Sequence, residues 1–248
     1  MTELPRETQV LAAVVTLVDT LLDDYDVVEL LTQLTESCTQ VLDVHAAGLL
    51  LADPGGELHL MAATSEKTRD LELFQLQAEQ GPCLDCFTTG QPLSVADLRG
   101  DAHRWPRFAE AATQAGFASV HALPMRAGGT VLGAMGLFGT QVGELNDADQ
   151  LVGQTLTHVA CVAILQERSP SPATVLPHLH HALKSRVLVE QAKGFLRERL
   201  GVSVETAFVL LRQYARVNGE HMSDVARRLM AHPTERGPIL DAMRQLHV

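Results

Sequence analysis

The sequence predicts an α+β domain followed by a smaller all-α domain, and three observations carry this prediction. Helical and strand patterns alternate over residues 8–168. Only helical patterns follow over residues 175–248. A short stretch rich in Pro and Ser, residues 169–174, separates the two and marks a linker. A chain of 248 residues has room for one domain of ordinary size and one smaller domain.

In the first domain, the spacing of apolar residues and the turn residues between them define the elements. The helix expected over 26–42 carries Leu30, Leu34 and Cys38 on one side, whereas 46–51 is a continuous apolar run typical of a buried strand. In chain order we expect helices 10–22 and 26–42, strands 46–51 and 58–63, helix 66–80, a short turn or helix over 81–90, strand 92–95, helix 105–115, strands 117–125 and 131–138, and a long helix 146–166 capped by Asn146.

Short motifs spread over this domain give it a resemblance to a known family. They are Gln80-Gly81-Pro82-Cys83-Leu84-Asp85, Thr89-Gly90-x-Pro92, Val95-x-Asp97-Leu98, Arg104-Trp105-Pro106-x-Phe108, Gly116-Phe117-x-Ser119-Val120-x-Ala122-x-Pro124 and Gly133-x-Met135-Gly136-Leu137. On these residues the segment resembles the GAF family of bacterial sensor domains, which have an antiparallel sheet with flanking helices. The resemblance implies a sensor of a small molecule or of redox state, and it leaves the signal unnamed.

Three helices and a short C-terminal helix are expected after the Pro/Ser stretch. The first spans 175–200 and ends at Gly201, a favourable C-cap residue. Ser203 is expected to cap the second helix and Ser223 the third. Their expected apolar positions are Leu183, Val187, Leu188, Ala192, Phe195 and Leu196, then Ala207, Phe208, Leu210, Leu211 and Val217, then Val225, Ala226, Leu229 and Met230.

A denser motif runs through the same helices. It reads Ala182-Leu183-x-Ser185-Arg186, Glu190-Gln191-Ala192-Lys193-Gly194-x-Leu196, Arg199-x-Gly201-x-Ser203, Glu205-x-Ala207-Phe208, Leu211-Arg212-x-x-Ala215-Arg216-x-Asn218 and Asp224-Val225-Ala226. On it the segment resembles the ANTAR family, the RNA-binding domains of bacterial transcription antiterminators, and the chain resembles GAF and ANTAR regulators of the actinobacterial type. The resemblance implies dimers that bind paired stem-loops in nascent RNA, stop a terminator hairpin from forming, and affect RNA polymerase only through the transcript.

Charge divides the chain in the same place. Residues 174–248 hold 11 Lys and Arg against 7 Asp and Glu, a net charge of +4, whereas residues 1–173 hold 8 against 23, a net charge of −15. This asymmetry is expected when only one domain meets phosphates. The first residues are polar and no apolar run reaches transmembrane length, so we expect a cytoplasmic protein with no membrane partner.

The candidate RNA-binding residues combine the ANTAR resemblance with charge and helical spacing. Arg186, Lys193 and Arg197 stand seven and four residues apart, so we expect them in one stripe of the first helix. Gly194 is unfavourable in mid-helix, which suggests that another backbone or a ligand approaches it closely. Cations hold an RNA backbone, and a flat ring stacks on a splayed base. The candidate set is Arg186, Lys193, Gly194, Arg197, Arg212, Tyr214 and Arg216, of which Arg197 and Tyr214 rest on spacing alone.

Cys83-x-x-Cys86 is the sharpest reactive candidate, because two thiols at this spacing suit a redox pair or half of a zinc site. A zinc site needs further ligands, and the sequence has no second such pair. Two buried small residues in a turn explain the cysteines most simply. No motif of a catalytic family is present, so we expect no enzyme and no metal centre, and the expected cofactor is at most a small-molecule ligand of the first domain.

Two other functions stay open at this point. One is a DNA-binding transcriptional regulator with a helix-turn-helix-like C-terminal domain, although a long first helix with its own basic residues is unlike a single recognition helix. The other is a sensory or scaffold dimer that binds no nucleic acid. In each case we expect a homodimer, because helices 10–22 and 146–166 carry more apolar surface than one small sheet can cover.

Overall fold

The structure is a computed structural model that describes residues 5–22, 25–166 and 175–246. These residues form two compact units, each with its own core. One unit contains residues 5–22, 30–166 and 175–179, and the other contains residues 25–29 and 180–246. The Pro/Ser linker expected over 169–174 lies outside the described residues, so its role stays a prediction.

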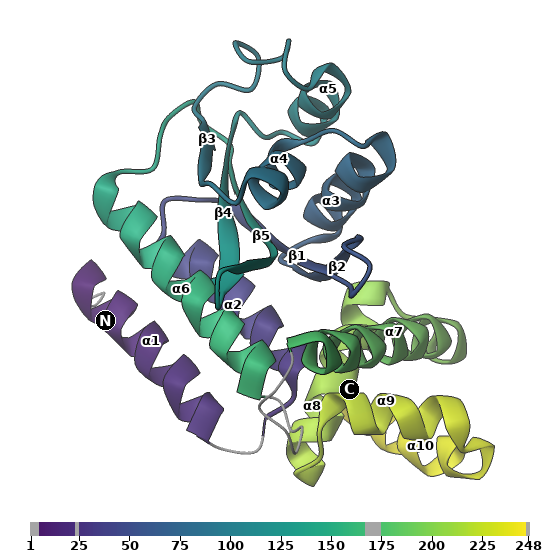
Figure 1. The fold of residues 1–248 in the computed structure, drawn as a ribbon. Helices are drawn as coiled ribbons and strands as arrows, with labels where there is room; N and C mark the ends of the chain where they lie inside the picture. Colours follow the sequence, from purple (N-terminus) through teal and green to yellow (C-terminus); the bar gives the residue numbers. More distant parts are fainter. Residues whose placement is uncertain (1–4, 23–24, 167–174, 247–248) are drawn as a thin grey trace. The chain divides into compact units, whose positions relative to one another are not determined.

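The first unit is an α+β sandwich built on one antiparallel sheet, as the alternation of helix and strand patterns predicts (Figure 1). Five strands lie in the order β2-β1-β5-β4-β3. The elements are α1 (Arg6–Leu22), α2 (Val27–Val41), β1 (Ala46–Ala52), β2 (Leu58–Ala63), α3 (Glu66–Ala78), α4 (Pro82–Thr89), β3 (Leu93–Val95), α5 (Pro106–Gln114), β4 (Ser119–Ala127), β5 (Thr130–Gly139) and α6 (Asp147–Gln166).

Helices cover both faces of the sheet, with α2 and α6 on one face and α3, α4 and α5 on the other (Figure 1). Strand residues alternate between these faces. On the first face, Met135 Sδ lies 3.5 Å from Cys38 Sγ of α2, and Gly153 of α6 packs against Leu123 of β4. On the second face, Gly136 of β5 lies against helices α3 and α4. The sheet is therefore covered on both sides, which explains why its central strands are almost continuously apolar.

The second unit contains α7 (Val175–Leu200), α8 (Val204–Asn218), α9 (Met222–Ala231), a 3₁₀ turn (Pro233–Glu235) and α10 (Arg236–Leu246). Two of the expected helix boundaries are confirmed. Gly201 adopts φ 68° after α7, and the Ser203 side chain accepts a hydrogen bond of 3.1 Å from the Thr206 N–H at the start of α8. The prediction for α9 is wrong, because His221 is its N-cap and Ser223 lies inside the helix.

Two of the apolar residues expected in the core of the second unit are exposed instead. Val187 is 55% exposed and Val217 is 68% exposed. The buried face of α7 passes through Val189, and Val187 lies about 200° around the helix from it, on the solvent side. Val217 stands in the last turn of α8. The buried apolar residues of the helices are Ala182, Val189, Ala192 and Leu196, then Ala207, Leu210, Leu211 and Ala215, then Met222, Val225, Ala226 and Leu229, then Ile239, Leu240 and Met243.

The remaining differences concern the ends of elements. Helix α1 begins at Arg6, four residues before the expected start, and β4 begins at Ser119 rather than at residue 117. The short turn or helix expected over 81–90 is a regular helix, α4, which begins at Pro82 and ends at the αL residue Gly90. None of the described helices is both long and apolar enough to cross a membrane.

Candidate functional site

The basic residues of α7 do not form the single exposed stripe that their spacing suggests. Arg186 and Lys193 are 9% and 6% exposed. Both bind one oxygen of Glu190, with Arg186 Nη2 at 2.6 Å and Lys193 Nζ at 3.1 Å from Oε1. Lys193 Nζ also lies 5.5 Å from the centre of the Phe208 ring of α8. These two cations therefore contribute to the packing of the helical unit, whereas Arg197 is exposed.

Gly194 lies on the exposed side of α7. A Cβ placed on it would meet no atom within 4 Å beyond the helix itself. Within the described residues, no neighbouring helix approaches this glycine, so the explanation by close packing of a second helix is wrong. A close approach by a ligand, which was the other explanation, stays a prediction.

Helix α8 places its three candidates differently. Tyr214 is only 8% exposed, so little of its ring is open to a base in this structure, and its stacking on RNA stays a prediction. Arg212 is half-buried, and its Nε donates to Glu29 Oε1 at 3.2 Å. Glu29 lies in the first turn of α2, which belongs to the second unit although the rest of α2 belongs to the first. Arg216 is exposed in the last turn of the helix. Arg197 and Arg216 are thus the two candidates whose guanidinium groups are open to a phosphate.

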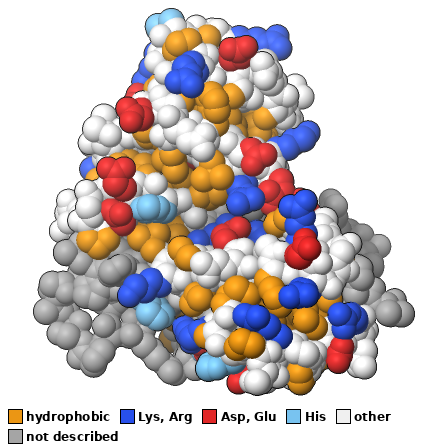
Figure 2. Space-filling model, turned by 90° about the vertical axis from the view of Figure 1, so that its right-hand side faces the viewer, with side chains coloured by type: hydrophobic (Ala, Val, Ile, Leu, Met, Phe, Trp, Pro, Cys, Tyr) orange, Lys and Arg blue, Asp and Glu red, His pale blue; other side chains and the backbone are white. Residues whose placement is uncertain are grey.

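One face of the molecule is mixed in character. Figure 2 shows that Lys and Arg side chains of the described residues lie there among hydrophobic side chains and do not merge into one basic patch. Val187 of α7 and Val209 of α8 are both more than half exposed. A surface with separate cations and apolar groups suits a folded nucleic acid with accessible bases better than it suits a regular row of backbone phosphates.

The first unit contains a buried polar cluster that the sequence did not reveal. Glu72 and Gln75 of α3 point into the layer between α3, α4 and the sheet, and both are completely buried. The Gln75 side-chain amide nitrogen donates to Glu72 Oε2. Its side-chain oxygen, Oε1, accepts a hydrogen bond of 3.2 Å from the Cys83 backbone N–H. The Cys83 thiol donates to Glu72 Oε1 at 3.9 Å. This cluster joins α3 to the first turn of α4.

Two glycines in the sheet make room for the cluster. A Cβ on Gly48 of β1 would lie 2.5 Å from Glu72 Oε1, and a Cβ on Gly136 of β5 would lie 2.6 Å from the same atom. Burial raises the pKa of Glu72 to about 8, although its hydrogen bonds to Gln75 and Cys83 act in the opposite direction. The carboxyl group is therefore mainly neutral near pH 7.

The Cys83 and Cys86 thiols are both completely buried on α4. Burial raises the pKa of Cys83 well above its usual value, and the charge of Glu72 adds to this effect. Burial also raises the pKa of Cys86 to about 12. A thiol is nucleophilic only as the thiolate, so neither cysteine is activated in this state. Their role as a redox pair stays a prediction. Among the described residues, no group of three or more His, Cys, Asp or Glu could hold a metal ion.

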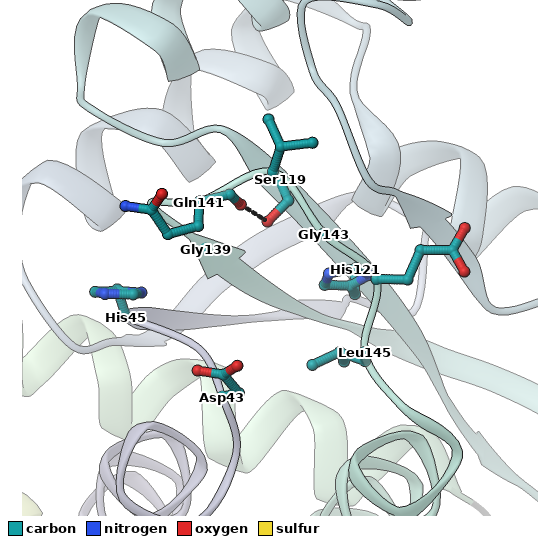
Figure 3. A pocket seen from close by; sticks show the side chains of 10 residues that line it. Asp43, His45, Ser119, His121, Gly139, Gln141, Gly143 and Leu145 are labelled. Carbon is teal, nitrogen blue, oxygen red and sulfur yellow. Dashed lines mark hydrogen bonds between the residues drawn. The ribbon is translucent and has the colours of Figure 1, made fainter.

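A recess of about 100 Å³ opens at the end of the sheet, on the side of α2 and α6 (Figure 3). In Figure 3, Asp43 and His45 line one side of it, while His121 and Leu145 line the other. The loop after β5 closes one end, held by the Ser119 hydroxyl, which donates to the Gln141 carbonyl at 2.8 Å. This volume holds a few water molecules or one small polar molecule.

His121 is one of the two most buried polar residues that line this recess, at 4% exposed beside 3% for Ser119. Its Nδ1 lies 2.7 Å from the Ser94 hydroxyl on the neighbouring strand. Burial lowers the pKa of His121, against an opposing effect of Glu144, so the ring is neutral near pH 7. The recess therefore offers a neutral imidazole, a hydroxyl, backbone groups and the carboxyl groups of Asp43 and Glu144, which can orient a small polar ligand.

Sequence reasoning missed both polar clusters for a common reason. The sequence does not distinguish a buried Glu or His from an exposed one, and neither residue has a characteristic spacing when it is buried. One signal was present, since an isolated glycine in a strand often marks a close approach of other atoms. Gly48 interrupts the apolar run of β1, and Gly136 interrupts β5. These two glycines point to the Glu72 cluster.

The fold has solved counterparts of low sequence identity. The GAF domain of an Acinetobacter phosphoenolpyruvate-protein phosphotransferase aligns with a TM-score of 0.51 and 12% identity, covering 69% of this chain and 94% of that one. The corresponding GAF domain from Coxiella burnetii aligns with a TM-score of 0.50 and 16% identity, covering 63% and 93%. A free methionine-R-sulfoxide reductase from Neisseria meningitidis, solved with its substrate, aligns with a TM-score of 0.51 and 15% identity, covering 68% and 95%. At these identities the likeness shows the fold alone.

Family models identify both units of the chain. The GAF domain model matches residues 24–165, and the ANTAR domain model matches residues 178–230. No curated protein matches the chain. GAF domains are sensory, ANTAR domains bind RNA in transcription antitermination, and neither is a catalytic family. Because the first match spans more than half of the chain and the second follows it directly, the chain belongs to the GAF family and is a signal-sensing regulator with a C-terminal ANTAR domain.

Proposed function

We propose that this protein regulates transcription by antitermination, with the ANTAR domain binding stem-loops in nascent RNA under the control of the GAF domain. The ANTAR match over residues 178–230 is the observation that carries the proposal. RNA polymerase is affected through the transcript, and the protein acts in the cytoplasm, where nascent bacterial RNA is found.

The exposed Arg197 and Arg216 are the proposed primary phosphate contacts. Arg186 and Lys193 both bind one carboxylate, Glu190, which offsets part of their positive charge. A phosphate could replace Glu190 only by breaking two ion pairs. We therefore assign Arg186 and Lys193 mainly to the shape of the RNA-binding surface, and Arg197 and Arg216 to direct contact.

The test is binding of the full chain to a hairpin RNA and to duplex DNA of the same sequence over a range of salt concentrations. Hairpin RNA should bind more tightly. Arg197→Ala and Arg216→Ala should each weaken binding by about 1 kcal/mol and reduce the salt slope by about one unit. Arg244→Ala is a matched control, because Arg244 is an exposed cation paired with Asp241 in α10. Equal affinity for duplex DNA would favour a DNA-binding regulator, and no affinity for either would favour a scaffold.

Helix α1 supports the expected homodimer. Four apolar residues on it, at spacings of four, three and four, are exposed: Leu11 at 66%, Val15 at 55%, Val18 at 41% and Leu22 at 80%. This spacing forms the narrow stripe by which two identical helices pack together. Helix α6 contributes less than its sequence suggests, because Leu156, Ala160, Ala163 and Ile164 are buried within the chain itself. Leu151 and Val162 of α6 stay exposed, at 70% and 42%.

Sedimentation of the full chain at micromolar concentration tests this dimer. Val15→Glu should shift the protein to monomer, because it places a charge in the centre of the α1 stripe. Val142→Glu is the control, since Val142 is 63% exposed in the loop after β5 and is not part of that stripe. A monomeric parent protein would remove the dimer from the proposal and leave RNA binding to be judged separately.

A further inference from the structure

Glu72 is completely buried, and no cation among the described residues forms an ion pair with it. From α3 it faces the Gln75 amide, and from α4 it faces Cys83, with Cys86 one turn further along. On the sheet side, the backbone of Gly48 and of Gly136 lies beside it. Arg126 of β4 affects the ionisation of Cys86 and does not act on Glu72. These neighbours of the carboxyl group are thus neutral while the thiols are protonated.

The packing of this layer therefore depends on the charge of one group. A neutral carboxyl group can remain buried with a few hydrogen bonds, whereas a buried carboxylate without a cation is strongly unfavourable. The sheet side leaves no room for relaxation, because both glycines already lie against Glu72 Oε1. An ionised Glu72 can gain water only if α3 and α4 move away from β1 and β5.

We propose that Glu72 makes the GAF domain responsive to protons: the neutral side chain holds α3 and α4 against the sheet, and its ionisation in mildly alkaline conditions loosens these helices. Burial of the carboxyl, which raises its pKa to about 8, sets the range of the response. The inference names a signal for the proposed regulator, and it rests on the proposed RNA function only where RNA affinity is the readout.

The position of α4 can be followed by tryptophan fluorescence. Trp105 is the only tryptophan of the chain, and its indole Nε1–H donates to Asp85 Oδ2 of α4 at 3.1 Å. The ring is 97% buried, with Arg104 stacked 4.2 Å from its centre. A displacement of α4 would break the hydrogen bond and change the solvent exposure of the ring. Tryptophan emission of the full chain should therefore follow the ionisation of Glu72.

The experiment is a titration of tryptophan emission from about pH 7 to about pH 9.5, a range above the usual titration of His and below that of Tyr. The parent chain should show one transition with its midpoint near pH 8. Glu72→Gln, which mimics the neutral acid, should stay folded and show no transition. Asp70→Asn changes an exposed carboxyl of the same helix and should leave the transition in place.

Cys83→Ala separates the carboxyl from the thiol. If Glu72 is the titrating group, the transition should persist in this variant, with its midpoint raised because the thiol hydrogen bond that favours the carboxylate is gone. Loss of the transition in Cys83→Ala and its retention in Glu72→Gln would overturn the proposal in favour of thiol ionisation. Hydrogen exchange of the parent chain gives an independent measurement, in which peptides from α3 and α4 should exchange several-fold faster above the midpoint. A parent chain with neither response would also overturn the proposal.

RNA affinity is measured over the same range with the hairpin RNA. It should change with the same midpoint in the parent chain and stay constant in Glu72→Gln. If the emission transition appears but no RNA binds at any pH, the proton response stands and the proposed RNA function fails. If RNA binds while emission and hydrogen exchange are flat, the RNA function stands and the proton response fails.

Discussion

Two glutamates, one in each unit, show how partners decide the charge of a side chain. Glu72 of the GAF domain is completely buried among an amide, a thiol and two glycines. Glu190 of the ANTAR domain keeps 27% of its side chain exposed and binds both Arg186 and Lys193. The first is arranged to be neutral and the second to be ionised.

This difference matches the tasks of the two units. A buried acid near its own midpoint converts a small change in conditions into a change of packing. A carboxylate held between two cations fixes the geometry of a helix surface. The GAF unit thus contains a group that can respond, and the ANTAR unit contains a group that holds its surface constant.

The largest expected effect is the pH dependence of stability that Glu72 causes. Its pKa is raised in the folded protein from the usual 4.5 to about 8. Between these values the unfolded chain releases a proton that the folded chain keeps, so the free energy of unfolding falls as pH rises. The fall should approach about 5 kcal/mol over this range. Glu72→Gln should remove this slope in urea titrations at several pH values, and an unchanged slope would contradict the assignment.

The next effect concerns Lys193 of the ANTAR unit. Its side chain is 8% exposed and is held by Glu190 and the Phe208 ring. Lys193→Ala should therefore lower the free energy of unfolding by about 2 kcal/mol, through lost packing and a weakened ion pair. Lys193→Met keeps the apolar stem and should recover part of this loss, as measured by urea unfolding at constant pH. Full stability in Lys193→Ala would show that the residue is free for RNA.

A pair of glycine substitutions sharpens the comparison of the two units. Gly48→Ala places a Cβ 2.5 Å from Glu72 Oε1 and should destabilise the protein by about 1–3 kcal/mol. Gly194→Ala meets no atom beyond its own helix and should stabilise it by about 1 kcal/mol, because alanine favours a helix over glycine. Thermal unfolding measures both. If Gly194→Ala also weakens hairpin binding, close approach by RNA explains the glycine.

The smallest expected effect is on the stability of Arg197→Ala. Arg197 is exposed, so its removal should change the free energy of unfolding by less than about 0.5 kcal/mol while RNA affinity falls. This variant is the counterpart of Lys193→Ala, in which stability changes first. Equal losses of stability in the two variants would contradict the division between contact and packing residues.

Much of the fold follows from local sequence. The apolar run of β1, the proline at the start of α5 and the Ser203 cap each act within a few residues, so their elements were predicted to within a few positions. The family motifs identified both domains, which the GAF and ANTAR matches confirm. The prediction from spacing was incomplete for α7. Arg186, Lys193 and Arg197 share one side of the helix, but packing buries only Arg186 and Lys193.

By itself, the sequence determined the order of elements, the two domains and the division of charge between them, because these depend on periodicity, capping and composition along the chain. Only the tertiary structure decided which polar groups are buried and what faces them. Glu72 meets Gly136, and Lys193 meets Phe208, across contacts between separate elements. The charge state of a carboxyl and the accessibility of a cation depend on such neighbours, which local sequence patterns do not specify.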